Sequence, residues 1–181
     1  MQQVLDVNIL DDPATQKTVS LWSVPCTIAA VVLVVVAGVR AVLEASAGEA
    51  LLWFGWLVVL YVVSLPVHEL VHALFFKLFG PAGTRVIFGF KSGMLYAGCP
   101  GVQLPRAQFA VVLLAPFVVL TLAYIAIGLV FHATLLAWCL FFLHTAGCAG
   151  DFYFVWVLMR HPEADLCEDT RTGIALWHSE G

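Results

Sequence analysis

Charged side chains are scarce in this chain of 181 residues. Asp, Glu, Lys and Arg make up 11% of the sequence and hydrophobic residues 62%, whereas ordinary soluble domains are about 25% charged and about 45–50% apolar. The mean hydropathy of +0.98 agrees with this imbalance. The composition excludes an ordinary soluble domain and indicates a membrane protein in contact with a lipid bilayer. The small formal net charge of −4 gives no indication of nucleic acid as a partner.

Cysteine pairs of the CxxC type are also absent. The five cysteines are odd in number and lie at Cys26, Cys99, Cys139, Cys148 and Cys167. We therefore expect small, buried side chains with free thiols and not a disulfide framework.

Four apolar segments are long enough to cross a bilayer. They cover about residues 21–42, 51–79, 109–131 and 133–159. The segments 1–20 and 160–181 are polar and are predicted to be tails. The sequence therefore predicts a single domain of the all-α polytopic membrane class, with about four transmembrane helices.

The basic residues are distributed unevenly around these spans. Four spans place both termini on one side, and that side collects seven basic residues: Lys17, Lys77, Arg85, Lys91, Arg106, Arg160 and Arg171. The other side has Arg40 alone. By the positive-inside rule, we expect both termini to lie in the cytoplasm.

The polar segment between the second and third spans has a different pattern. Residues 84–90 are rich in β-branched and aromatic side chains, residues 91–93 suit a turn, and residues 94–97 return to apolar character. This pattern predicts a small hairpin, and an irregular amphipathic loop is the alternative. A hairpin edge in this region would suit an extended substrate that adds as a strand, with Val86, Ile87 and Phe88 as the candidate contact residues.

The second span contains the motif His-Glu-x-x-His. His68 and His72 are four residues apart, so they share one face of a helix and can bind one zinc ion. Glu69 lies beside them as a candidate base for a water molecule. Ionisable residues within a membrane span cost a few kcal/mol each, which favours a functional role for all three.

The third zinc ligand is predicted from depth in the bilayer. His68 follows Leu51 by 17 residues and Asp151 follows Ala133 by 18, so both lie roughly 26 Å below the same membrane face. We expect Asp151 to complete the metal site. His144 and Cys148 are the competing candidates on the same span, and otherwise each is expected to contact a metal ligand or to face the substrate.

Together these residues resemble the intramembrane zinc metalloproteases of the site-2 type. The resemblance rests on His68-Glu69-x-x-His72, the hairpin-like segment, Ala115-Pro116 in the third span and Gly150-Asp151 in the fourth. The chain is more closely similar to a zincin peptidase family of bacterial membrane proteins. The site-2 proteases carry glycine after the aspartate, whereas Phe152 follows it here.

The resemblance implies zinc-dependent hydrolysis of a peptide bond in a membrane-embedded or membrane-proximal protein, in the bacterial cytoplasmic membrane. Two alternatives from other classes stay open. One is a catalytically inactive membrane scaffold or chaperone of the same fold, against which the intact Glu69 argues. The other is a metal or proton transporter with His and Asp side chains along its path.

Overall fold

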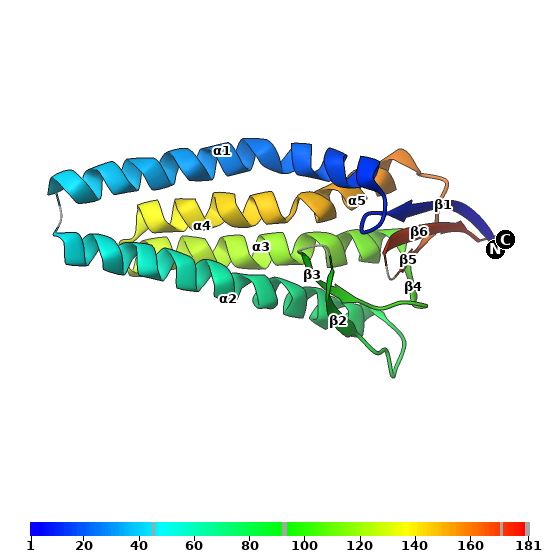
Figure 1. Ribbon diagram of the computed structural model, residues 1–181. Helices are drawn as coiled ribbons and strands as arrows, with labels where there is room; N and C mark the ends of the chain where they lie inside the picture. Colours follow the sequence, from blue (N-terminus) through cyan, green and yellow to red (C-terminus); the bar gives the residue numbers. More distant parts are fainter. Residues whose placement is uncertain (45, 92–93, 171, 180–181) are drawn as a thin grey trace.

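The computed structural model describes residues 1–44, 46–91, 94–170 and 172–179. Helices run side by side over most of its length, and the strands gather at one end together with both termini (Figure 1). The helices are α1 (Pro13–Glu44), α2 (Ala47–Phe79), α3 (Arg106–Val130), α4 (Thr134–Gly147) and α5 (Ala149–Arg160).

Within the described residues, three helices are long and apolar enough to cross a membrane, namely α1, α2 and α3. Helices α4 and α5 pass the same test as a pair, with a bend of 52° between them. The number of spans is therefore four if this bent pair counts as one. The bend falls at Cys148, between Gly147 and Ala149.

Apolar side chains cover the outside of these helices. In the most apolar stretch of α1 only 6% of the residues are buried, and in that of α2 only 11%. Val31, Val35 and Val62 are each more than half exposed. A surface of this kind is unfavourable in water and favourable in hydrocarbon, so the outer face supports the assignment to a membrane protein.

The described chain is mostly helical with three to four apolar helices, as expected, but it is not purely α, because the polar ends of the chain and a short strand before α3 build a four-stranded antiparallel sheet. Its order is β1 (Gln2–Asn8), β6 (Gly173–His178), β5 (Leu166–Asp169) and β4 (Gln103–Pro105). Strand β1 pairs with β6 from the opposite end of the chain. Short strands that pair over such a distance have no local turn between them to indicate the pairing.

The predicted hairpin is confirmed. Strand β2 (Ile87–Lys91) pairs antiparallel with β3 (Met94–Gly98), while positions 92 and 93 of the predicted turn lie outside the described residues. Gly89 of β2 lies directly opposite Tyr96 of β3. A side chain at Gly89 would overlap the Tyr96 ring, so glycine leaves the room in which this ring packs.

One hydrophobic core joins the sheet to the ends of the helices. Leu104, Ile174 and Leu176 from the strands pack in the same cluster as Phe76 of α2 and Phe109 of α3. A second cluster lies between α2, α3 and α4, farther along the bundle, and includes Leu57, Leu120 and Leu140. The first core holds the sheet against the last turns of α2, next to the predicted metal site.

Candidate metal centre

Helix α2 presents both motif histidines to the interior of the bundle. His72 is 6% exposed and the side chain of His68 is 13% exposed. Their Nε2 atoms lie 3.0 Å apart, as expected for side chains one turn apart on a helix. His72 is seven residues before the end of α2 at Phe79, or about 10 Å along the helix axis. The pair therefore lies within the apolar part of the bundle, near the end that carries the sheets.

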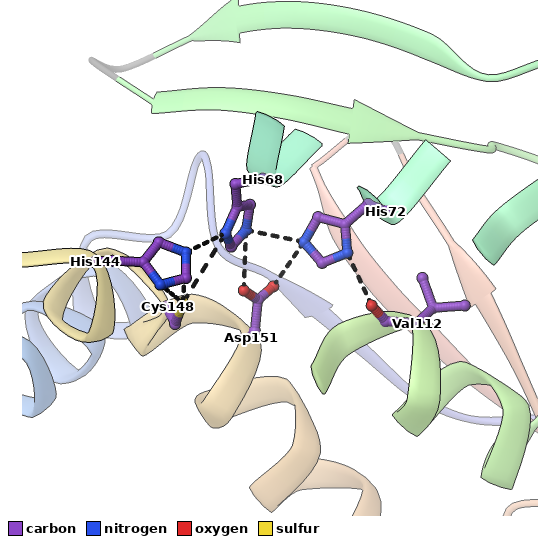
Figure 2. A network of polar contacts seen from close by, with 6 residues as sticks. All are labelled: His68, His72, Val112, His144, Cys148 and Asp151. Atoms are coloured by element: carbon purple, nitrogen blue, oxygen red, sulfur yellow. Dashed lines mark hydrogen bonds and ion pairs between the residues drawn. The ribbon is translucent and has the colours of Figure 1, made fainter. Parts of the chain in front are cut away.

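Asp151 of α5 completes the group, directly after the bend between α4 and α5. Its Oδ2 lies 3.2 Å from His68 Nε2, and its Oδ1 lies 3.4 Å from His72 Nε2. Figure 2 shows the carboxylate between the two imidazole rings. Residues far apart in the sequence thus place two nitrogen donors and one carboxylate close together, as the depth argument predicted.

The spacing of these three donors suits a zinc ion. Zinc bonds to nitrogen and oxygen are about 2.0–2.1 Å long and tetrahedral, which separates neighbouring donor atoms by about 3.3–3.4 Å. The Nε2–Nε2 separation of 3.0 Å is close to this value, and so are the separations of 3.2 and 3.4 Å from the two Nε2 atoms to the two oxygens of the Asp151 carboxylate. His68, His72 and Asp151 also satisfy the general geometry of a metal-binding group. Three protein ligands leave a fourth position of a tetrahedral zinc site open, as in hydrolytic sites.

The hydrogen-bond partner of His72 is the kind that orients a metal-binding histidine. His72 Nδ1 lies 2.9 Å from the carbonyl oxygen of Val112, which can only accept, so Nδ1 carries the hydrogen. The other ring nitrogen, Nε2, faces the Asp151 carboxylate and His68. A neutral His72 therefore presents the lone pair of Nε2 to the donor group, and a backbone carbonyl on the other ring nitrogen is a usual partner of a metal-binding histidine.

Proline explains why this carbonyl is free. In a regular helix the oxygen of Val112 would accept from the N–H of residue 116. That residue is Pro116, which lies inside α3, is fully buried and has no N–H. The Ala-Pro element of the third span therefore supplies an acceptor that orients His72. Sequence reasoning missed this connection, although the offset of four residues was visible.

His144 and Cys148 lie on the far side of His68 from His72. His68 Nδ1 is 3.1 Å from His144 Nε2, and Cys148 Sγ is 3.9 Å from His68 Nδ1. His144 and Cys148 are both buried. Neither reaches the three-donor group that contains Asp151, but the two form a second group with His68.

Glu69 lines a cavity of about 190 Å³ together with His68, His72 and Asp151. Ala97 of β3 lines the same cavity, so the Glu69 carboxylate lies between the histidines and the hairpin. The sheets close the cavity from the other side. The motif thus faces a space that a small part of a substrate can enter.

Asp169 of β5 also lines this cavity, and sequence reasoning placed it in a polar tail. It accepts a hydrogen bond from the backbone N–H of Cys99. Burial raises the pKa of Asp169 to about 7, although the Cys99 hydrogen bond opposes the rise. A side chain at Gly98 would come within 2.6 Å of the Asp169 Oδ2 atom, so glycine makes room for this carboxyl group.

The hairpin residues predicted to contact a substrate are spread over two environments. Val86 precedes β2 and packs against the core near the sheet. Ile87 and Phe88 lie on β2 and are 40% and 56% exposed. The cavity itself is lined by β3, from Leu95 to Gly98. Phe88 instead borders a separate hollow with Glu69.

The fold and the donor set define a membrane protein with a candidate metal centre of the His-Glu-x-x-His class. Residues 61–166, more than half of the chain, match the model of the family described as "Putative zincin peptidase". The chain belongs to this family. Membership supports a metallopeptidase and implies zinc as the metal. No curated protein and no solved structure matched the chain.

Proposed function

We propose that this protein is an intramembrane zinc metalloprotease of the site-2 type, which hydrolyses a peptide bond of a membrane-embedded or membrane-proximal protein. The observation that carries the proposal is the position of the donor group. His68, His72 and Asp151 lie inside a bundle of apolar helices and beside a cavity that is lined on its other side by residues of β3, β5 and β6. Such a site suits a substrate that arrives along the membrane and needs water for its cleavage.

The protein residues have separate roles in this proposal. His68, His72 and Asp151 would hold a zinc ion, which when bound would act as a Lewis acid and lower the pKa of water. Glu69 takes a proton from the attacking water as the new C–O bond forms at the scissile carbonyl. It then delivers this proton to the amine nitrogen as the C–N bond breaks. The Val112 carbonyl and His144 hold the two imidazole rings in place.

The hairpin has a proposed role in binding the substrate as an added strand. Within the described chain, β2 and β3 pair only with each other, so each has a free edge. A transmembrane helix must unwind before its peptide bonds are accessible, and pairing with a strand replaces the lost backbone hydrogen bonds. Because Leu95–Gly98 line the cavity, β3 joins Val86, Ile87 and Phe88 as a candidate contact.

The main test uses purified protein in proteoliposomes with a mixture of synthetic single-span peptides, whose fragments are identified by mass spectrometry. Glu69→Gln should slow cleavage by about 10²–10⁴-fold, the usual contribution of a general base, and should keep the zinc content. Glu163→Gln is the matched control, because that carboxylate is exposed and does not line the cavity.

Two results would contradict the proposal. Fully zinc-loaded wild-type protein that cleaves no peptide would favour the inactive scaffold. Zinc or proton flux into the vesicles, equal in wild type and Glu69→Gln and without cleavage, would favour the transporter.

The substrate-strand proposal has its own test. Proline removes a backbone donor and weakens a strand, so one variant places it at Phe88 in β2 and the other at Tyr96 in β3. If β3 holds the substrate, Tyr96→Pro should abolish cleavage and Phe88→Pro should reduce it less, with zinc retained in both. Equal cleavage by both variants and wild type would contradict a role for the hairpin.

A further inference from the structure

The second group of donors lies outside the proposed catalytic set. It consists of His68 Nδ1, His144 Nε2 and Cys148 Sγ, which come from α2, α4 and the bend after α4. The separations are 3.1 Å between the two nitrogens, 3.5 Å from Cys148 Sγ to His144 Nε2 and 3.9 Å from Cys148 Sγ to His68 Nδ1. Figure 2 shows His144 and Cys148 beside His68, on the side of its ring that faces away from His72.

These separations suit a metal ion as well as those of the first group do. A tetrahedral ion with bonds of about 2.0 Å to nitrogen and about 2.3 Å to sulfur places nitrogen and sulfur about 3.5 Å apart. The observed distances scatter around that value. The site is well shielded, since His144 is 3% exposed and Cys148 is 0% exposed.

Hydrogen bonds can also join these groups, but they leave the thiol hydrogen of Cys148 without a ring nitrogen to accept it. If His68 Nδ1–H donates to His144 Nε2, the single lone pair of that nitrogen is used, and the Nδ1–H of a neutral His144 faces Cys148 Sγ at 3.8 Å. A metal ion that replaces the proton on His68 Nδ1 and the proton on Cys148 binds all three donor atoms directly.

We propose that His68, His144 and Cys148 form a second metal site, selective for a soft or borderline ion such as zinc, with His68 bridging the two metal positions through its two ring nitrogens. Thiolate distinguishes this site from the first, because sulfur ligands favour softer ions than a carboxylate does. Binding releases two protons, one from His68 Nδ1 and one from the Cys148 thiol. The shared imidazole then becomes a more electron-rich ligand for the first site.

Cobalt(II) is the probe, because a thiolate ligand gives an intense charge-transfer absorption in the near ultraviolet that nitrogen and oxygen ligands do not give. Zinc-free protein in detergent is titrated with cobalt(II), and the bound metal is counted after gel filtration. Wild type should bind two ions per chain and develop the thiolate band. Cys148→Ser should lose the band and one ion and keep the other. Cys139→Ser should behave as wild type, because Cys139 is a buried cysteine of α4 that belongs to neither donor group found among the described residues.

The Asp151→Asn variant separates this inference from the proposed protease function. It should lose the first site and the cleavage activity and keep the thiolate band. It also decides the case if Cys148→Ser fails to fold. A wild-type protein that saturates with one ion and no thiolate band would overturn the second site. So would a band that persists unchanged in folded Cys148→Ser.

Discussion

Substitution of Pro116 tests the metal centre without changing any of the proposed metal ligands. Replacing it with alanine restores an N–H at the position that lies four residues after Val112. The new N–H competes with His72 Nδ1 for the Val112 oxygen, to which His72 is now bound at 2.9 Å. Loss of a group that orients a metal-binding histidine lowers metal affinity by about 10–100-fold. We therefore expect Pro116→Ala to weaken zinc binding by about 1.4–2.7 kcal/mol.

The assay is competition for zinc against a coloured chelator in detergent, with helix content followed by circular dichroism. Pro25→Ala is the matched control, because Pro25 also lies inside an apolar helix and is neither a lining residue of the cavity nor a member of a donor group. Pro116→Ala should release zinc at lower chelator concentration than wild type and Pro25→Ala do, while all three keep their helix content. Equal zinc affinity in the three proteins would refute the role assigned to the Val112 carbonyl.

Three further predictions concern the sheet and the topology. A side chain at Gly173 would lie 1.8 Å from the Val7 oxygen, so Gly173→Ala should lower stability by about 2–4 kcal/mol through lost β1 hydrogen bonds and exposure of Val7. Gly55→Ala should leave stability unchanged, because a side chain there meets open space. Equal thermal unfolding of Gly173→Ala and Gly55→Ala would contradict the pairing of β1 with β6. Because the pKa of Asp169 is raised from 3.8 to about 7, its carboxyl group stays protonated to a higher pH in the folded protein than in the unfolded chain. Zinc-free wild type should therefore lose about 2–3 kcal/mol of stability between pH 5 and pH 8. Asp169→Asn should not show this loss of stability. Identical pH dependence of thermal unfolding in wild type and Asp169→Asn would contradict the prediction. Reporter fusions after Gly48 and at the C-terminus should lie on opposite sides of the membrane, and reports from the same side would exclude four spans.

Several features follow from the sequence alone because they depend on local patterns. Scarce charge and long apolar runs are sufficient to predict helices that suit a bilayer. The spacing of His68 and His72 is sufficient to place both on one face, because the helical repeat is local. The hairpin also follows from a short stretch of side chains with a turn between them. Even the choice of Asp151 needed only helix rise and a common membrane boundary.

Tertiary structure decided the features that join distant parts of the chain. The pairing of β1 with β6 brings the two termini together, and no periodic pattern in either short strand indicates its partner. Asp169 enters the cavity only because this sheet packs against the end of α2. The free oxygen of Val112 follows from Pro116 in the sequence, but its acceptance of a hydrogen bond from His72 depends on how α2 and α3 pack. Side-chain contacts of this kind depend on how the helices and strands pack against one another, and the spacing of residues along one element does not predict that packing.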